Sequence, residues 1–188
     1  MSRPDRTRRA LLDAATLVLG KDAAASLGQV ATVAGVGRTT LYRYFPTRED
    51  LVRALVVDAL DRVAQAIEAA QPAAGSAIEA LQRVADTVIP LGPSLRFLAA
   101  EPAVYHTPEL LRRWYDALEP VAEAIRRGQT AGEIRRELPV TWVVDSFAGA
   151  ILTAWDSVDE GRLARHDAPR LVLSTVLYGV AQPPGVTS

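Results

Sequence analysis

Residues 26–50 read SLGQVATVAGVGRTTLYRYFPTRED, and this stretch predicts two short helices joined by a tight turn. Ser26 and Gln29 are spaced to form a capping box at the start of the first helix, where each side chain satisfies a free backbone N–H. The Gly-Val-Gly sequence at 35–37 ends this helix, because glycine takes the positive φ that a sharp reversal requires. Pro46 stops the second helix, since proline has no backbone N–H to donate.

The two helices and their turn form a helix-turn-helix candidate at 26–45. In the second helix, 38–45, Leu41 and Phe45 are four residues apart and are expected to face the core. The opposite face carries Arg38, Thr39, Tyr42 and Arg43, with Thr40 and Tyr44 on its flank. Such side chains suit nucleic acid, because arginine forks onto guanine edges, threonine contacts thymine methyl groups and tyrosine binds phosphate oxygens. An ordinary amphipathic helix with a solvated polar face would show the same periodicity.

The rest of the chain predicts further helices, because apolar residues recur at helical spacing and no segment alternates with period two for long. The expected helices cover 5–20, 48–70, 76–89, 94–100, 108–127, 140–158 and 168–180. Gly20 and Gly128 are expected to end the helices that precede them, and Pro120 to kink or split its helix. The predicted fold class is all-α.

Composition narrows the class of protein. The chain has 188 residues, 49% of them hydrophobic and 23% charged, which is a globular balance. It has no cysteine and two distant histidines, His106 and His166, so disulfides, a thiol nucleophile, a metal site and a cofactor are not expected. No uncharged apolar run is long enough to span a membrane and the first residues are too polar for a signal peptide, so we expect a soluble cytoplasmic protein.

Charge is unevenly distributed along the chain. Residues 1–48 carry eight basic and three acidic side chains, a net charge of +5, and the remainder carries −6. A basic N-terminal part on an acidic body suggests that only the N-terminal part meets a polyanion. Arg3, Arg6, Arg8 and Arg9 could form a basic arm that reaches phosphates or the minor groove, and a solvated tail is an equal alternative.

The segment AGVGRTTLYRYFPTREDL, residues 34–51, resembles the DNA-binding signature of TetR-type transcriptional regulators, and the likeness covers roughly 5–65. The resemblance implies structural positions at Ala34, Gly35, Val36, Leu41 and Phe45. It implies DNA-binding positions at Gln29, Arg38, Thr39, Thr40, Tyr42, Arg43, Tyr44 and Arg48, the last holding phosphate at the start of the fourth helix. Gly28 departs from the pattern, because many members have a polar residue there, and Gly37 replaces a capping serine or threonine.

The resemblance also implies an organisation into domains. Residues 5–65 would form a three-helix DNA-binding domain, joined by the long fourth helix to a ligand-binding and dimerisation domain at 66–182, with a flexible tail at 183–188. The last two helices are apolar on nearly all sides and therefore need cover. A second copy would supply it through a four-helix interface about a two-fold axis, whereas a monomer could bury the pair in its own core.

The function predicted from these features is a homodimeric DNA-binding repressor, released from a pseudo-palindromic operator by a small hydrophobic or aromatic effector. Candidate effector-binding residues are Phe97, Tyr105, His106, Trp114, Tyr115, Trp142 and Phe147, with Trp155 as a further aromatic. Aromatic side chains with a few polar tips suit a partly planar ligand, although each also serves as ordinary core. The alternatives are a small all-helical enzyme, for which no acid, base or nucleophile constellation is visible, and a regulator without an effector.

Overall fold

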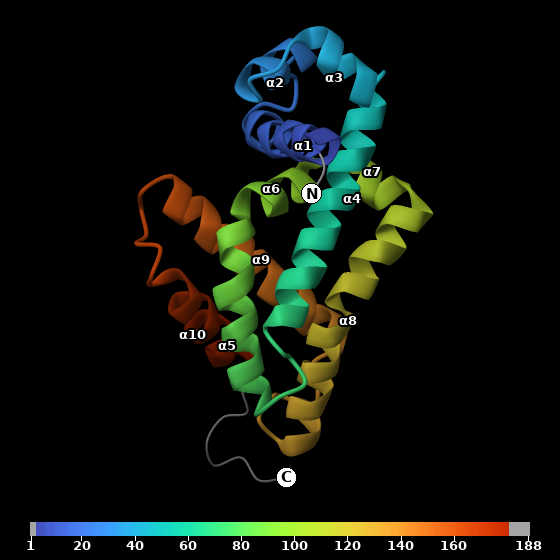
Figure 1. Cartoon of the computed structure of the whole chain (residues 1–188). Coiled ribbons are helices and arrows are strands. Elements are labelled where there is room, and N and C mark those ends of the chain that lie inside the picture. Colours follow the sequence, from blue (N-terminus) through green and yellow to red (C-terminus); the bar gives the residue numbers. More distant parts are fainter. Residues whose placement is uncertain (1–2, 181–188) are drawn as a thin grey trace. The chain divides into compact units, whose positions relative to one another are not determined.

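The computed structural model of the chain describes residues 3–180, apart from the side chains of residues 3, 103, 105, 179 and 180. The tail predicted at 183–188 lies outside the described residues. The elements are α1 (Arg3–Lys21), α2 (Leu27–Val33), α3 (Arg38–Tyr44), α4 (Arg48–Ala69), α5 (Ala77–Val88), the 3₁₀ turn η1 (Ile89–Leu91), α6 (Gly92–Ala100), α7 (Pro102–His106), α8 (Pro108–Ala131), α9 (Val140–Asp159) and α10 (Ala168–Val180) (Figure 1). Every one of these elements is helical, which confirms the all-α fold class.

Contacts between residues divide the chain into two compact units. The first contains the residues up to Asp61 together with Pro93–Trp114, and the second contains Arg62–Gly92 together with the residues from Tyr115 onward. The division into functional domains after residue 65 stays a prediction.

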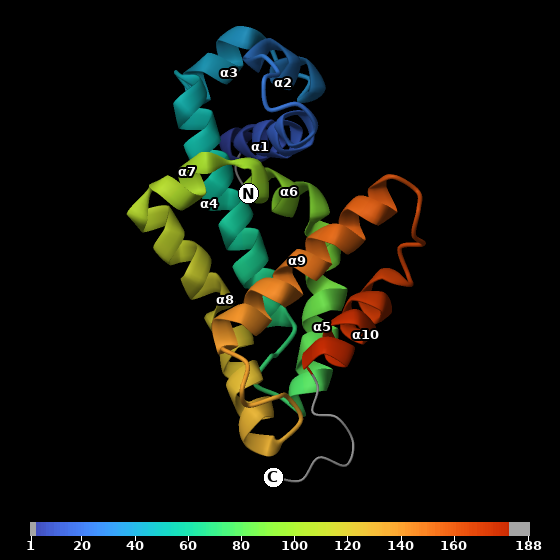
Figure 2. The same ribbon diagram turned by 180° about the vertical axis from the view of Figure 1, so that it is seen from behind.

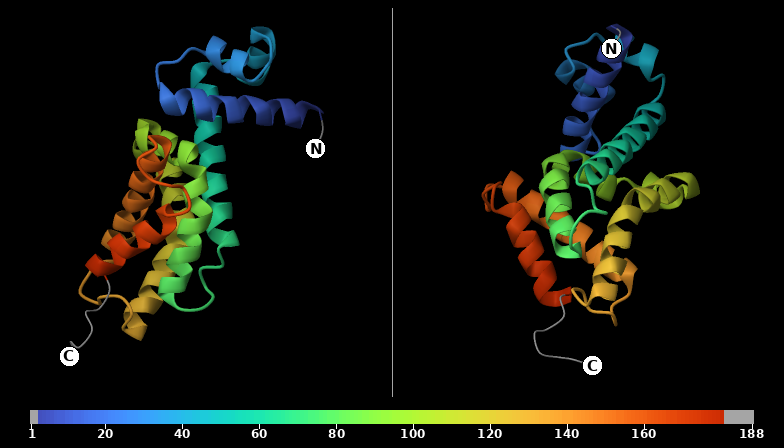
Figure 3. Two further views of the ribbon diagram at one scale, coloured as in Figure 1. Left: turned by 90° about the vertical axis from the view of Figure 1, so that its left-hand side faces the viewer. Right: turned by 60° about the horizontal axis from the view of Figure 1, so that its bottom comes forward.

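The first unit contains the helix-turn-helix. The blue helices α1, α2 and α3 lie together beside the first part of α4 (Figure 3). Their apolar stripes meet in one small core, in which Leu11, Val30 and Leu41 are fully buried. The first part of α4 closes this core with Leu51 and Leu55, which are also fully buried. Residues four apart on each helix therefore supply the core, as the sequence pattern predicts.

The second unit is built on α5, α9 and α10. The helix α10 packs on both α5 and α9 (Figure 2). Six of the twelve residues of α5 are buried, and α9 contributes Phe147 and Ile151 to the core. Gly92 lies against the indole of Trp155, because a Cβ built on Gly92 would stand 1.6 Å from the ring.

Three sequence predictions about helices are corrected. The short helix α7 was not expected, and Gly20 lies inside α1, which continues to Lys21. Gly128 does not end its helix either, because α8 continues to Ala131. The residue after that end is Gly132, whose φ of +79° is the left-handed conformation of a helix C-terminus. Pro120 lies inside α8 without splitting it.

Candidate nucleic-acid interface

The start of α2 and the turn between α2 and α3 are both fixed by local hydrogen bonds. The predicted capping box is present: the N–H of Gln29 donates to Oγ of Ser26 at 3.3 Å, and Oε1 of Gln29 accepts the N–H of Ser26 at 2.7 Å. Gly35 has a φ of +68°, and the N–H of Val36 donates to the carbonyl of Ala31 at 3.0 Å. The start of α3 is therefore placed by the backbone of the preceding helix.

Burial separates the two faces of α3 as the periodicity predicts. Leu41 and Phe45 are buried, whereas Tyr42 is 50% exposed. The other predicted DNA-facing side chains are exposed at Arg38, Thr39 and Arg43 and half-buried at Thr40 and Tyr44. The polar face is thus open to solvent, and its contact with DNA stays a prediction.

Tyr44 has a partner inside its own unit. Its hydroxyl donates to the carbonyl of Pro4 at 3.3 Å, and the guanidinium of Arg43 lies 5.5 Å from the centre of its ring. The hydrogen bond to Pro4 joins α3 to the start of α1. Of the two tyrosines on α3, Tyr42 is therefore the one with the freer side chain.

Arg38 lies across α2 at Gly28. A Cβ built on Gly28 would stand 2.9 Å from Nη2 and 3.1 Å from Nε of Arg38. The guanidinium therefore occupies the space that a side chain at position 28 would take. The departure from the family pattern at Gly28 thus has a structural counterpart, which sequence reasoning missed.

Arg48 is half-buried and donates to the carbonyl of Ala25 at 2.6 Å and to that of Ala23. These carbonyls belong to the connection between α1 and α2. Arg48 therefore has a structural task in addition to the predicted phosphate contact.

The N-terminal arginines lie on α1 and do not form a separate arm. Arg9 forms ion pairs with Asp58 at 2.6 Å and with Asp13 at 2.8 Å, so its guanidinium is held by carboxylates of α1 and α4. Burial alone would lower the pKa of Arg9, but the hydrogen bonds and charges of Asp58 and Asp13 raise it above its usual value. The guanidinium of Arg8 lies 5.8 Å from the centre of the Phe45 ring.

The predicted effector residues belong to both units and differ in burial. Phe97 and Phe147 are buried in different units, Trp114 is half-buried, and His106 is exposed. Tyr115 and Trp142 are also exposed, Trp155 is buried beside Gly92, and the side chain of Tyr105 lies outside the described part of the chain.

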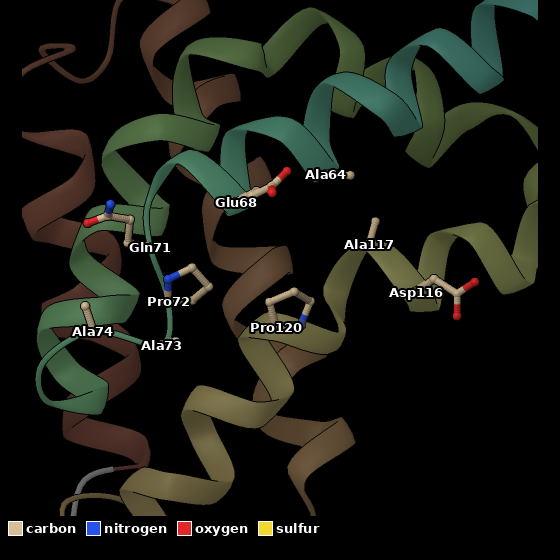
Figure 4. A pocket seen from close by; sticks show the side chains of 9 residues that line it. All are labelled: Ala64, Glu68, Gln71, Pro72, Ala73, Ala74, Asp116, Ala117 and Pro120. Carbon is tan, nitrogen blue, oxygen red and sulfur yellow. The ribbon is translucent and has the colours of Figure 1, made fainter.

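A groove that the sequence did not indicate lies in the second unit, with a volume of about 780 Å³. Its walls are the end of α4 (Ala64, Glu68), the loop 71–74 and the middle of α8 (Asp116, Ala117, Pro120) (Figure 4). None of the predicted effector residues lines it. Most of its lining residues are alanine or proline, which have no functional group that marks a binding site in the sequence, so only the tertiary structure reveals the groove.

Two further kinds of site are absent from the described residues. No three histidine or carboxylate side chains among them gather as the ligands of a metal ion would. No helix between residues 3 and 180 combines the length and the hydropathy needed to cross a membrane.

Comparison with known proteins links the helix-turn-helix to a family. The family model described as bacterial regulatory proteins, tetR family, matches residues 11–55. The transcriptional repressor LfrR of Mycolicibacterium smegmatis is 36% identical over 180 residues, which is 96% of this chain and 93% of LfrR. The transcriptional regulator NfxB of Pseudomonas aeruginosa is 27% identical over 165 residues, covering 85% of this chain and 86% of NfxB.

Solved structures agree with the sequence matches. The structure of LfrR from Mycobacterium smegmatis in complex with proflavine superposes with a TM-score of 0.82 and 33% identity, covering 100% of this chain and 99% of that one. A TetR family regulator from Marinobacter aquaeolei, 22% identical, gives a TM-score of 0.78 over 96% of this chain and 98% of its own, and shares the fold. The identity to LfrR over nearly the whole chain, with the family match across α2 and α3, shows that this chain belongs to the tetR family of bacterial regulatory proteins, which bind DNA to regulate transcription and are not enzymes.

Proposed function

We propose that the chain is a homodimeric repressor that binds a pseudo-palindromic operator through α3 and leaves it when a small aromatic effector binds. The observation that carries the DNA-binding part is the exposed polar face of α3, set on a buried apolar face. Arg38, Thr39, Tyr42 and Arg43 would read the major groove, with Thr40 and Tyr44 at its edge. Gln29 and Arg48 would contribute at the start of α2 and of α4.

The dimer is supported by the exposed apolar side chains of α9 and α10. Trp142 is 62% exposed, Leu171 46% and Tyr178 92%. Large apolar side chains exposed on two adjacent helices are typical of an interface. Two copies of α3 would then face DNA about 34–36 Å apart, one helical turn, as a two-fold operator requires.

The effector is supported by the relative LfrR, which has been solved in complex with proflavine, a planar aromatic dye. The same class of compound is proposed for this chain. Release follows if the effector binds one conformer of the dimer more tightly than the DNA-bound conformer. As a bacterial transcription regulator the chain would act in the cytoplasm, where the DNA is.

Titration of labelled duplex from the region upstream of the gene tests DNA binding. Affinity should fall by roughly 10³–10⁵ between 50 and 200 mM salt, because a dimer that contacts many phosphates releases their counterions. A shuffled duplex of the same length is the control and should bind much more weakly. Absence of binding at low salt would contradict the proposal, and failure of proflavine to release the duplex would reject only the effector part.

A further inference from the structure

Two consecutive aromatic residues stand at the end of α3, and each has an arginine guanidinium over its ring. The guanidinium of Arg43 lies 5.5 Å from the centre of the Tyr44 ring, and that of Arg8 lies 5.8 Å from the centre of the Phe45 ring. Phe45 is buried, so its ring is a fixed support, whereas Arg8 is exposed. A guanidinium attracted to the face of a ring keeps N–H donors for another partner.

Tyr44 holds the helix that carries Arg8. Its hydroxyl donates to the carbonyl of Pro4 at 3.3 Å. Pro4 and Arg8 are four residues apart on α1 and therefore lie on the same face of that helix. The hydrogen bond at Pro4 and the ring contact at Arg8 thus join the start of α1 to the end of α3 at two points, both within the first unit. Arg8 and Arg43 are thereby brought to the same end of α3.

These two arginines are not neutralised by a carboxylate within the described part of the chain. Neither Arg8 nor Arg43 forms an ion pair or a side-chain hydrogen bond between residues 3 and 180. By contrast, Arg9 and Arg113 of the same unit each pair with a carboxylate of α4. Two positive charges at one end of a short helix repel each other, and an anion bound there relieves the repulsion. The two uncompensated charges therefore favour an anionic partner.

We propose that Arg8 is a further DNA-binding residue, whose guanidinium binds a backbone phosphate beside the bases that α3 would read, and that Tyr44 is a positioning residue, which holds α1 in place for this contact. The proposal rests on the function proposed above. Arginine suits a phosphate because its N–H groups form a fork that meets two oxygens. A phosphate contact carries no sequence information, so Arg8 would set affinity and register rather than the choice of operator.

The salt dependence of DNA binding tests the contact of Arg8. The probe is labelled duplex from the region upstream of the gene, titrated with the full chain at several salt concentrations. Arg8→Gln should lower the slope of log affinity against log salt by about 1.8 in magnitude, because a dimer loses two phosphate contacts and each contributes about 0.9. At 100 mM salt the affinity should fall by about tenfold or more, equally for this duplex and for a shuffled one, since the phosphates are the same in both. A parent slope in Arg8→Gln, or a loss confined to the upstream duplex, would overturn the proposal.

Three further variants separate the placed charge of Arg8 from a general loss of charge. Arg8→Lys keeps the charge and should keep most of the slope of the parent. Arg165→Gln removes the same charge from the exposed loop before α10 and should leave the slope unchanged. Arg6 is exposed two residues before Arg8, on the other side of α1, so Arg6→Gln should lower the slope by less than half as much. Equal losses in Arg6→Gln and Arg8→Gln, or in Arg8→Lys and Arg8→Gln, would contradict the phosphate contact.

A double-mutant cycle tests the positioning by Tyr44. Tyr44→Phe removes the hydroxyl that donates to Pro4 and keeps the ring beside Arg43. In the parent background it should reduce the salt slope and weaken binding about three- to fivefold, whereas in the Arg8→Gln background it should change neither. A purely structural role would lower the unfolding free energy without a change in the salt slope, and that result would overturn the role of Tyr44.

Failure of this proposal is distinct from failure of the proposed function. A parent chain that binds neither duplex at low salt would contradict the repressor and, with it, the contact of Arg8. A parent chain that binds, with an unchanged slope in Arg8→Gln, would leave the repressor in place and remove Arg8 from the interface.

Discussion

Gly28 and Arg38 depend on each other at the scale of single residues. The guanidinium of Arg38 lies where a Cβ at position 28 would stand, only 2.9 Å from Nη2. Glycine inside a helix is unfavourable by roughly 0.5–1 kcal/mol relative to alanine, so α2 gives up stability at this position. In return, the guanidinium of Arg38 can lie beside the exposed polar face of α3.

Gly28→Ala should therefore raise the unfolding free energy slightly and weaken operator binding several-fold, because the added methyl group displaces Arg38. Denaturant unfolding and duplex titration measure the two effects. In an Arg38→Ala background the same substitution should no longer affect DNA binding, since the group it displaces is gone. An equal loss in both backgrounds would show that Gly28 acts on its own.

Tyr42 and Arg43 give the most direct test of whether the exposed polar face of α3 binds the operator. Replacing either with alanine should weaken operator binding by about 1–3 kcal/mol, or roughly five- to 150-fold, and leave the oligomeric state unchanged. Arg165→Ala is the matched control, because Arg165 is an exposed arginine on the loop before α10. Parent-like affinity in both variants would show that α3 does not read the operator.

At the scale of elements, two glycines near the end of α8 have different tasks. Gly132 takes a φ of +79°, whereas Gly128 is helical and allows close packing. A Cβ on Gly128 would stand 2.5 Å from Cβ of Ala77 and 2.9 Å from Cδ1 of Ile134. Gly128 therefore lets the start of α5 approach α8.

Gly128→Ala should destabilise the chain by about 1–3 kcal/mol, since the methyl group meets buried neighbours that cannot move freely. Urea unfolding measures the change. Gly28→Ala is the matched comparison, because the same substitution in α2 meets only the flexible end of an arginine. Equal unfolding free energies for the two variants would show that the close approach at Gly128 does not contribute to stability.

The sequence predicted those elements that depend on local pattern. The capping box at Ser26, the stripe of Leu41 and Phe45, and the start of α10 at Ala168 all follow from spacing within one segment. The end of α8 did not, because two nearby glycines look alike until Ala77 is seen beside one of them.

The candidate sites divide in the same way. Exposure of Tyr42 follows from the period of one helix, so it could be predicted. The hydrogen bonds of Arg48 to backbone carbonyls and the groove between α4 and α8 join segments more than 20 residues apart, so no local pattern indicates them.

At the scale of the whole molecule, the exposed apolar side chains of α9 and α10 would supply the dimer interface that a two-fold operator requires. Two recognition helices can read two half-sites only if a stable interface fixes their spacing. Tyr178, 92% exposed on α10, is the most exposed of the large hydrophobic side chains described.

Tyr178→Glu and Leu171→Glu should each raise the dimer dissociation constant at least tenfold, because a charge buried at an interface without a partner is costly. Sedimentation velocity at micromolar concentration measures the change. Ala164→Glu adds the same charge on the exposed loop before α10 and should leave assembly intact. A parent chain that sediments as a monomer would contradict the four-helix interface.

The arginines that hold backbone carbonyls have a consequence for acid tolerance. Arg48 braces the connection between α1 and α2, and Arg83 and Arg127 brace the loop after α4. A guanidinium keeps its proton at every pH that a folded protein survives, and a peptide carbonyl does not titrate there either. These two connections should therefore keep their shape in mildly acidic solution, and any early loosening on acidification should begin where carboxylates act as acceptors.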